Sequence, residues 1–476
     1  MTATAQEFDI IVIGAGPGGY PAAIKAAQHG KRVALVEAKE LGGTCLNRGC
    51  IPSKALIANA EIWNKVIHAA EYGINVENPS FDFGKMAERK DQVVGKVRSG
   101  LTTLIKSNNI TLFRGFGKFI SANEIKVTGE ENALLRADKI IIATGSEPRN
   151  IPAFPFDHER ILDSTSTLEL TKLPKSIVIV GGGVIGCEFA SLYREFNVEV
   201  TILEMMPTLI PMECKSVSSA LTKAFKKKGI GIRTEAMVEG IDRTKEGVCV
   251  RLAGGETMNA DIAIVAVGRS LNTEGIGLEN SGVIVKENGL ISVDDKMETN
   301  VPGIYAIGDI ASRWWLAHVA SHQGLVAASN ACGVEAHMHY NAVPSVIFTD
   351  PEIGTVGLTL EQAIEEGYNA TVGAFPFQAL GKSQATLETE GFAQIVTDKD
   401  TGQLLGAQVV GYQAATLVAE MGVAIANEMT IESITDTIHA HPTIAEVWLE
   451  AALVANETPL HIPPKAKKRS PAHMEA

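Results

Sequence analysis

The 476-residue chain lacks the features that mark several protein classes. It has only six cysteines, too few for the disulfide framework of a secreted scaffold. It has no apolar run long enough to cross a membrane. Its first residues form neither a charged region before an apolar core nor an arginine-rich amphipathic presequence. We therefore expect a cytoplasmic protein, or one of the mitochondrial matrix if a eukaryotic presequence has been removed.

Positive charge is also in deficit. The chain has 42 Lys and Arg against 55 Asp and Glu, a formal net charge of −13. This balance argues against a general binder of nucleic acid or of anionic membranes, so we expect neither partner. The length suffices for roughly three or four domains.

Two of the cysteines lie close together, in the stretch Gly42–Lys54 (GGTCLNRGCIPSK). Cys45 and Cys50 can close a small disulfide without moving a domain, and such a loop reopens easily, which suits redox catalysis. A structural disulfide, two unrelated buried cysteines and half of a zinc site are the alternatives. Zinc usually needs a second ligand pair. No such pair exists among the remaining cysteines, Cys187, Cys214, Cys249 and Cys332.

A strand, a glycine-rich turn, a helix and a second strand precede this stretch. The first strand is expected over 8–13, and the second runs over 33–36 and ends at Glu37. The glycines of the turn are Gly14, Gly16 and Gly19. They permit a tight turn, close approach of a pyrophosphate and close helix packing, and the acid suits a ribose hydroxyl. We expect a dinucleotide site; the alternative is a sharp turn in a fold without a cofactor.

The same pattern recurs later in the chain. A strand over 176–180 leads into a second glycine-rich turn, and a strand over 198–203 ends at Glu204. The glycines of this turn are Gly181, Gly183 and Gly186. The repeat predicts two dinucleotides, or one held by two lobes. Glu204 would accept hydrogen bonds from a free 2′-hydroxyl and repel a 2′-phosphate, and no arginine follows at 205–208, which favours NAD over NADP.

The remaining pattern is typical of an α/β protein. Helices are expected from about Ser53 into the seventies and over 83–106, and strands over 114–119, 139–143, 261–267 and 300–309. Asp309 ends the last of these strands and could instead cap a helix. From about Ser345, strands and amphipathic helices alternate without a glycine-rich turn, which indicates a separate domain with a role in assembly.

A histidine near the C-terminus has an acid five residues further on. His441 is followed by Pro442, and Glu446 completes the group. Such a pair suits general-base chemistry, but a lone histidine is more often a surface or core residue. Metal ligation with His439 is a third interpretation.

Taken together and in this order, the motifs resemble the class I flavoprotein disulfide reductases. The resemblance covers roughly residues 8–464 and is strongest to the dihydrolipoamide dehydrogenases, the E3 components of 2-oxoacid dehydrogenase complexes. It implies an α/β fold with two Rossmann-like domains, for FAD and NAD, and a C-terminal α/β dimerisation domain. The implied segments are 1–148 and 269–344 for the FAD-binding (central) domain, 149–268 for the NAD-binding domain and 345–464 for the interface domain. Basic residues and prolines at the end of the sequence predict a disordered tail over 465–476.

The resemblance also implies roles for individual residues. Cys50 would face the flavin as the charge-transfer thiol, and Cys45 would meet the substrate. His441 of the partner subunit would act as the base, oriented by Glu446. Glu37 would hold the FAD ribose. The further cofactor-binding residues that it implies are Lys54, Gly117, Thr144, Gly145, Ser146, Glu188, Gly268, Asp309 and Ala317.

The implied reaction oxidises protein-bound dihydrolipoamide to lipoamide and reduces NAD⁺ to NADH. The implied partners are a second copy of the chain, the lipoyl domains and E2 subunit-binding domain of a 2-oxoacid dehydrogenase complex, or the H protein of glycine cleavage. Arg48 departs from the family pattern, because many relatives have Val there, and it adds a cation that could tune the thiols.

Other activities fit the sequence less well. Glutathione-type reductases usually use NADPH, which Glu204 disfavours. Mercuric reductases and large thioredoxin reductases have extra C-terminal cysteines, and none follows Cys332. A flavin-binding scaffold without activity is the alternative from another class. The joint presence of Cys45, Cys50 and His441 argues against it.

Overall fold

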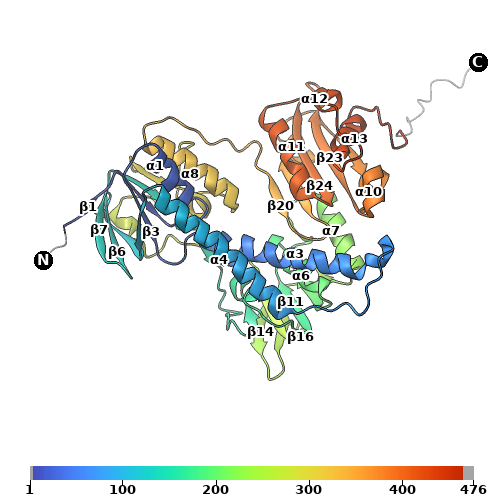
Figure 1. Cartoon of the computed structure of the whole chain (residues 1–476), viewed down its shortest axis with the longest axis horizontal. Coiled ribbons are helices and arrows are strands. Elements are labelled where there is room, and N and C mark those ends of the chain that lie inside the picture. Colours follow the sequence, from blue (N-terminus) through green and yellow to red (C-terminus); the bar gives the residue numbers. More distant parts are fainter. Residues whose placement is uncertain (1–3, 465–476) are drawn as a thin grey trace, which may run out of the picture. The chain divides into compact units, whose positions relative to one another are not determined.

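The computed structural model describes residues 4–464 (Figure 1). This part of the chain forms two compact units. The first unit contains the described residues up to Pro207 together with Ile230–His339. The second contains Thr208–Gly229 together with the described residues from Tyr340 onward. The expected disordered tail, 465–476, lies outside the described residues.

The first unit begins with a five-stranded parallel sheet in the order β19-β8-β2-β3-β4. The strands are β2 (Ile10–Ile13), β3 (Val33–Glu37), β4 (Thr111–Arg114), β8 (Lys139–Ile142) and β19 (Ile304–Ala306). Every residue of β2 and β3 is buried, as continuous apolar runs predict for a sheet that is covered on both faces. The strands expected over 8–13 and 33–36 are therefore confirmed, whereas the one expected over 300–309 is shorter.

Two helices, α1 (Gly19–Gln28) and α8 (Ala317–Ala331), pack against each other in this unit (Figure 1). Glycine makes the close approach possible, because a Cβ on Gly324 would lie 2.4 Å from the carbonyl oxygen of Gly18. The N-terminus of α8 thereby lies in the same unit as the first glycine-rich turn.

The two cysteines of Gly42–Lys54 lie on short and long helices that follow β3. These are α2 (Gly43–Arg48) and α3 (Cys50–Ile67), and α4 (Phe83–Ser107) follows them. The prediction for α4 is confirmed, and Asp82 caps it by accepting a hydrogen bond from the Lys85 amide at 3.1 Å. The helix expected into the seventies ends at Ile67, and a 3₁₀ turn, η1 (Ala69–Tyr72), continues the chain.

The prediction of one strand over 114–119 is wrong, because the chain passes from one sheet to another at Gly115. A Cβ at this position would lie 2.8 Å from the carbonyl oxygen of Thr128, so only glycine fits the crossing. β5 (Phe116–Ser121) then joins a mixed sheet in the order β1-β7-β6-β5, in which β7, β6 and β5 are antiparallel and β1 runs parallel to β7. Its other strands are β1 (Gln6–Glu7), β6 (Glu124–Thr128) and β7 (Ala133–Arg136).

The second glycine-rich turn belongs to a second sheet of the same design. Five parallel strands follow the order β10-β17-β11-β12-β13, beside an antiparallel sheet in the order β14-β15-β16. The strands are β10 (Ile161–Leu162), β11 (Ser176–Val180), β12 (Glu199–Leu203), β13 (Gly231–Arg233), β14 (Val238–Arg243), β15 (Val248–Leu252), β16 (Thr257–Ala260) and β17 (Ile262–Val265). The helix after the turn is α6 (Val184–Glu195). The predicted internal repeat is thus confirmed and extends beyond the motif to whole sheets.

The second unit is built around a five-stranded antiparallel sheet in the order β20-β21-β24-β23-β22. Its strands are β20 (Ser345–Ile347), β21 (Ile353–Gly357), β22 (Ala370–Pro376), β23 (Gly391–Asp398) and β24 (Leu404–Gly411). Helix α11 (Ala414–Ala426) packs on β21 and β24, and α13 (Glu446–Ala455) packs on β22 and β23 (Figure 1). Trp448 of α13 is fully buried, and its indole nitrogen donates to the carbonyl of Leu417 in α11 at 3.0 Å.

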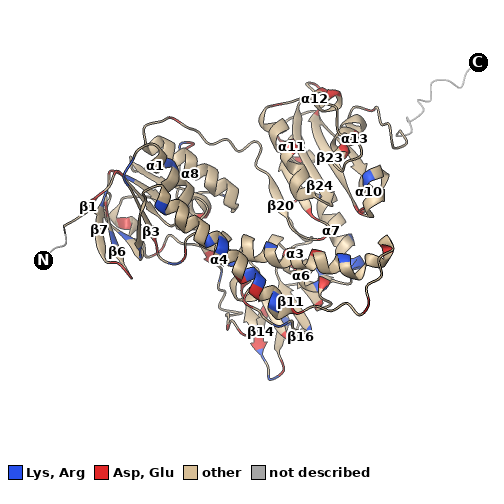
Figure 2. Ribbon diagram, viewed as in Figure 1, with Lys and Arg blue, Asp and Glu red and all other residues tan. Residues whose placement is uncertain are grey.

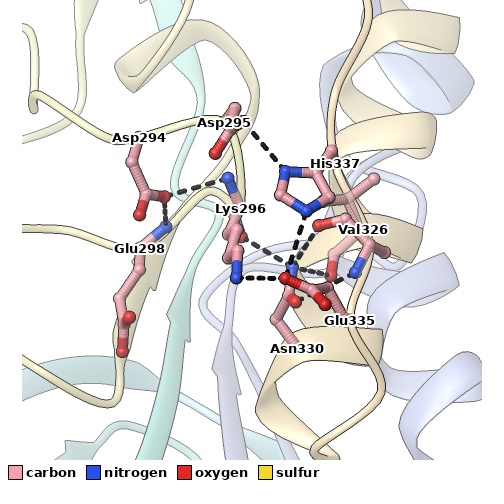
Figure 3. Close-up of polar contacts among 9 residues, drawn as sticks. Asp294, Asp295, Lys296, Glu298, Val326, Asn330, Glu335 and His337 are labelled. Atoms are coloured by element: carbon pink, nitrogen blue, oxygen red, sulfur yellow. Dashed lines mark hydrogen bonds and ion pairs between the residues drawn. The ribbon is translucent and has the colours of Figure 1, made fainter.

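A polar network holds the chain at the C-terminal end of α8 (Figure 3). The His337 ring lies with Nδ1 2.9 Å from Asp295 Oδ2 and Nε2 3.4 Å from Glu335 Oε1, while Lys296 Nζ pairs with the same Glu335 oxygen at 2.7 Å. Asn330 donates to the carbonyls of Lys296 and of two further residues. The neighbouring Asp295 raises the pKa of His337. The network therefore fixes one end of the helix whose other end begins at Ala317.

Candidate functional site: a thiol pair between two dinucleotide-type turns

The two thiols are held by helices that meet at Gly49. Cys45 lies in α2, and Cys50 is the first residue of α3. Both side chains are partly buried, and both carry free thiols in this structure. The N-terminus of a helix favours a negative charge, so the position of Cys50 at the start of an 18-residue helix favours its thiolate.

The thiols differ strongly in acidity. Cys45 donates a hydrogen bond to the sulfur of Cys50, which raises the pKa of Cys45 and lowers the pKa of Cys50 to about 7. Burial opposes the decrease at Cys50, and the positive charge of Lys54 supports it. The pair is therefore poised to exist as one thiolate, on Cys50, and one thiol, on Cys45, near neutral pH.

Lys54 links α3, the helix that begins at Cys50, to the second glycine-rich repeat. Its Nζ lies 2.9 Å and 2.8 Å from the two carboxylate oxygens of Glu188 on α6. The side chain of Glu188 is only 11% exposed. Lys54 and Glu188, which the resemblance implied as cofactor-binding residues, thus form an ion pair that places a fixed cation near Cys50.

The first glycine-rich turn needs glycine for steric reasons that the structure makes explicit. Gly14 has φ +100°, and a Cβ there would lie 2.3 Å from the Ala143 carbonyl oxygen. A Cβ on Gly19 would lie 1.8 Å from the carbonyl oxygen of Gly14. Gly16 has room around it, since its nearest neighbour would be the Gly43 Cα at 3.9 Å. Two glycines therefore allow the turn to form, and the third leaves space above it.

Glu37 closes this turn from the end of β3. Its Oε2 accepts from the Ala15 amide at 2.7 Å, and its Oε1 accepts from the Lys39 amide at 2.8 Å. The carboxylate is buried, and each oxygen retains a second lone pair for a ribose hydroxyl. The sequence indicated a ligand contact at Glu37 but missed its function as a brace for the turn.

Helix α2, which carries Cys45, packs directly on the first turn. The Gly42 amide donates to the Ala15 carbonyl at 2.8 Å. A Cβ on Gly43, which has φ +59°, would lie 2.7 Å from the Cα of Gly16. The redox motif and the first phosphate turn are therefore in backbone contact.

Ser146, Asp309 and Arg269 form a small polar cluster. Ser146 donates a short hydrogen bond to Asp309, and Arg269 donates to the Ser146 hydroxyl and carbonyl, each at 2.6 Å. Asp309 lies in a 3₁₀ turn, η3 (Gly308–Ile310), and does not cap it. The predicted residues Ser146 and Asp309 are thus brought together. Arg269, to which the motifs assigned no role, anchors Ser146 and lies 4.0 Å from Asp309.

The neighbouring Thr144-Gly145 peptide is clamped by Asn272. Its side chain donates to the Thr144 carbonyl at 2.9 Å, and the Thr144 hydroxyl donates to the Asn272 carbonyl at 2.7 Å. Gly145 has φ +67° and open space where a Cβ would project. No motif in the sequence pointed to Asn272, because its partners lie 128 residues away in the chain.

Three further predicted residues lie in the same unit. Gly117 on β5 has little room for a side chain, since a Cβ would lie 3.2 Å from Val36 and 3.3 Å from Ile13. Gly268 has φ +117° and an open side. Ala317 is the first residue of α8, where backbone amides favour an anionic or electron-rich group.

The second turn reproduces the first. Gly181 has φ +109°, with its Cβ position 2.4 Å from the Ala266 carbonyl oxygen, and a Cβ on Gly186 would lie 2.0 Å from the Gly181 carbonyl oxygen. Glu204 is buried and accepts from the Gly182 amide at 2.5 Å and from the Met206 amide at 2.7 Å. A Cβ on Gly183 would meet nothing within 4 Å.

His441 and Glu446 form a separate pair in the second unit. The Nδ1 of His441 lies 2.7 Å from Glu446 Oε1, and the other oxygen of Glu446 accepts from the Thr443 amide at 2.8 Å. The His441 side chain is 76% exposed. His439 pairs instead with Glu420 at 3.0 Å. Within residues 4–464, no three His, Cys, Asp or Glu side chains gather as metal ligands.

Arg48 acts on a carboxylate and not on the thiols. Its Nη1 lies 3.1 Å from Glu40 Oε2. The charged neighbours that act on the pKa of Cys50 are Lys54 and Glu188. The expectation that Arg48 tunes the thiols therefore has no geometric support.

These residues fit the groups that the two turns were expected to hold. The braced turns, the open sides of Gly16, Gly145 and Gly183, and the amides at the helix starts form cradles for pyrophosphate groups. The buried acids Glu37 and Glu204 have the chemistry required for ribose hydroxyls.

Comparison with known proteins agrees with this geometry. Residues 8–324 match the pyridine nucleotide-disulphide oxidoreductase family, and residues 343–452 match the dimerisation domain of the same family. The chain belongs to this family, whose members use a flavin and a pyridine nucleotide. The dimerisation domain indicates a homodimer.

Relatives extend over nearly the whole chain. It is 50% identical to dihydrolipoyl dehydrogenase of Chlamydia pneumoniae, over 97% of this chain and 100% of the relative. It is 44% identical to dihydrolipoyl dehydrogenase of Geobacillus stearothermophilus, over 96% of this chain and 98% of the relative. The crystal structure of LpdA from Mycobacterium tuberculosis superposes with a TM-score of 0.89 at 28% identity, over 93% of this chain and 99% of that chain. No helix within residues 4–464 is both long and apolar enough to span a bilayer.

Proposed function

We propose that the chain is a dihydrolipoyl dehydrogenase, which oxidises protein-bound dihydrolipoamide to lipoamide and reduces NAD⁺ to NADH. The observation that carries the proposal is the thiol pair, in which Cys45 donates to a Cys50 of pKa about 7 beside the first dinucleotide turn. Full-length relatives of up to 50% identity bear this name. The buried Glu204 at the second turn supports NAD over NADP.

The two turns would hold different cofactors. The first turn with Glu37, Thr144, Asp309 and Ala317 would hold FAD, and the second turn with Glu204 would hold NAD. When bound, FAD accepts an electron pair from the thiols and passes it to NAD⁺ as a hydride. The Lys54–Glu188 pair would lie near the flavin, and Arg269 would orient Asp309 through Ser146.

The thiols carry out the exchange with the substrate. A substrate thiolate attacks Cys45 in the Cys45–Cys50 disulfide, so that a mixed disulfide forms and Cys50 leaves as a thiolate. The low pKa of Cys50 makes it a good leaving group. The second substrate thiolate then attacks the substrate sulfur of the mixed disulfide. This step releases oxidised substrate and leaves Cys45 and Cys50 as the reduced pair.

His441 would remove the substrate protons. With Nδ1 donating to Glu446, Nε2 is the nitrogen free to accept a proton. Glu446 is itself fixed by the Thr443 amide, so the ring is held in one orientation. We place this pair at the thiols of the partner subunit, which makes each active site of the homodimer a product of both chains.

The proposal extends to organisation and partners. The domains would be 1–148 and 269–344 for FAD, 149–268 for NAD and 345–464 for the interface. The protein partners would be lipoyl domains and the E2 subunit-binding domain of a 2-oxoacid dehydrogenase complex, or the H protein of glycine cleavage, in the cytoplasm.

The test is turnover of dihydrolipoamide with NAD⁺. Cys45→Ser and Cys50→Ser should each abolish it while flavin absorbance per chain remains that of the parent. Cys249→Ser, a control on β15, should retain full turnover. Activity with glutathione disulfide and NADPH, in the absence of lipoamide turnover, would instead identify a glutathione-type reductase. Flavin binding without either activity would identify a scaffold.

Subunit mixing tests the composite site. Inactive Cys45→Ser chains and inactive His441→Gln chains are mixed under conditions that exchange subunits. In a random equal mixture, about a quarter of the wild-type sites should recover, because each heterodimer has one site without a lesion. Verified exchange without recovery would mean that cysteine and histidine act within one chain.

A further inference from the structure

Three exposed methionines gather at the end of the strand that leads to Glu204. Most methionines within residues 4–464 are buried or half-buried, whereas Met205, Met206 and Met237 are 70%, 44% and 61% exposed. The Glu204 carbonyl accepts from the Ala236 amide at 2.9 Å. The backbone at Met237 therefore lies beside the segment that carries the other two. We call these three residues the methionine rim.

The methionine rim is an apolar exception on the surface. Single exposed apolar residues are common, but a group of them more often marks a surface that something covers. Figure 2 shows that α4, a helix of the same unit with an exposed face, instead carries charged residues of both signs along its length. The equivalent segment of the first repeat has no thioether, because Glu37 is followed by Ala38 and Lys39. The rim is therefore a feature of the second repeat.

The position of the rim indicates what covers it. Glu204 has the chemistry required for a ribose hydroxyl, and Met205 and Met206 directly follow it. The Met206 amide donates to the Glu204 carboxylate at 2.7 Å, so the rim and the ribose site share one piece of backbone. An adenine ring on that ribose has flat faces, and thioethers make favourable contacts with aromatic rings. The occupant is therefore the adenine of the dinucleotide at the second turn.

We propose that the methionine rim is a modification site, at which oxidation by a peroxide lowers the affinity of the second turn for NAD⁺. The proposal rests on the proposed function, which assigns NAD to this turn. The thioether sulfur gives up an electron pair to the peroxide as an S–O bond forms and the O–O bond breaks. With hydrogen peroxide, the other oxygen leaves as water. The sulfoxide that results is polar, so covering it with adenine costs free energy that covering a thioether does not.

The modification would act on one cofactor and not on the other. The acid of the first turn has no methionine directly after it, so the flavin should stay bound in the presence of peroxide. Methionine sulfoxide reductases return sulfoxides to thioethers, so the loss of affinity should be reversible. A peroxide would thereby slow the reduction of NAD⁺ without destroying the enzyme.

The test treats the FAD-loaded dimer with hydrogen peroxide and then with dithiothreitol, which reverses disulfide formation but leaves sulfoxides. Untreated protein passes through the same steps. Peptide mass spectrometry should find an added oxygen on each residue of the rim. In calorimetric titrations the affinities for NAD⁺ and for ADP-ribose should both fall about threefold or more, because the two ligands share the adenosine half. Flavin absorbance per chain should not change, and sulfoxide reductases for both epimers should restore the affinity.

Matched variants locate the effect. The triple variant with Met205→Leu, Met206→Leu and Met237→Leu should have the same affinity before and after peroxide, whatever its starting value. Met212→Leu is the control. Met212 is 91% exposed and should be oxidised with the others, but it belongs to the second unit, so this variant should lose affinity as the parent does. If the triple variant binds NAD⁺ too weakly to titrate, at least one of the single leucine variants must show a smaller loss than the parent.

Three results would overturn the proposal. These are sulfoxides on the rim with unchanged affinity, an equal loss of affinity in the triple variant, and a loss that the reductases do not reverse. Mass and binding are measured directly, so these results do not depend on lipoamide turnover. An untreated parent that binds NAD⁺ but does not turn over dihydrolipoamide would contradict the proposed function alone. An untreated parent that does not bind NAD⁺ would contradict both.

Discussion

The two glycine-rich turns of the first unit have nearly the same backbone but different surroundings. In each, the first glycine donates to the penultimate or last carbonyl of the neighbouring strand at 2.8 Å, from Gly14 to Val36 and from Gly181 to Leu203. In each, a glutamate 22 residues after an amide of the turn accepts from that amide. The scaffold for a pyrophosphate is thus the same twice.

Other elements pack on the first turn. A Cβ on Gly43 of α2 would lie 2.7 Å from the Gly16 Cα. Ser321 of α8 donates to the Pro17 carbonyl at 2.7 Å. The second turn is open. Nothing lies within 4 Å of the Cβ position of Gly183, and Val184, at the place of Pro17, is 40% exposed.

This difference is what the proposed assignment of FAD to the first turn and NAD to the second requires. A turn that is packed under other elements suits a dinucleotide that stays through many cycles, which is what a flavin must do. An open turn suits a dinucleotide that enters and leaves in every cycle, as NAD⁺ does. Substitutions at matched positions of the two turns test whether they serve separate cofactors.

The largest effect is expected from Gly19→Ala. Its Cβ would lie 1.8 Å from the Gly14 carbonyl oxygen, so the first turn cannot keep its shape. The purified protein should lack flavin absorbance and all turnover. Gly100→Ala on α4, where a Cβ meets nothing within 4 Å, is the control and should remain yellow and active. A yellow, active Gly19→Ala enzyme would contradict the reading of the first turn.

Gly186→Ala makes the equivalent change in the second turn, where the Cβ would lie 2.0 Å from the Gly181 carbonyl oxygen. This variant should keep its flavin, and dihydrolipoamide should still bleach the flavin in stopped-flow experiments. Reduction by NADH should fail. Loss of flavin here would show that the two turns do not serve separate cofactors.

Glu204→Ala should have a smaller and more selective effect. It removes the carboxylate that repels a 2′-phosphate and that braces the Gly182 amide. The ratio of kcat/KM for NADH over NADPH should fall about tenfold or more, from loss of a charged hydrogen bond and of repulsion. An unchanged ratio, measured at matched concentrations, would place the selectivity elsewhere.

Lys54→Met should have the smallest effect, because it changes an acidity without blocking a step. The thiolate of Cys50 exists above its pKa of about 7, and Lys54 helps to hold that value down. Without this cation the pKa should rise by about one unit or more, so the thiolate should appear only at higher pH. The measurement is a pH titration of the long-wavelength absorbance of the reduced enzyme. Lys65→Met, further along α3, should leave the titration unchanged.

The repeat could be predicted from sequence because its signals are local. The glycines of each turn and the acid at the end of the next strand follow one another within one βαβ unit. The contacts that brace the site could not. Arg269 joins Ser146 across 123 residues, and Asn272 clamps Thr144 across 128. No spacing rule reports such partners, because only the folded sheet brings them together.

Local patterns also misled at two places. Arg114 to Phe119 has the composition of one strand, yet the Gly115 crossing divides it between two sheets. Arg48 lies between the cysteines in sequence, yet its guanidinium pairs with Glu40. In both cases the path of the backbone decides which sheet or partner a residue reaches, and a local sequence pattern does not report that path. The roles assigned to Cys45, Cys50 and His441 remain predictions for the experiments above.

The brace that Glu204 applies to the second turn has a consequence for the speed of exchange. A phosphate loop that is ordered only by its ligand costs conformational entropy at every encounter, and that cost slows or weakens binding. Here the Gly182 and Met206 amides are already fixed by the carboxylate. A dinucleotide that arrives therefore meets a preorganised surface and orders little of the chain around it. Modest affinity and rapid release can then coexist with selectivity, as a carrier that turns over with each catalytic cycle requires.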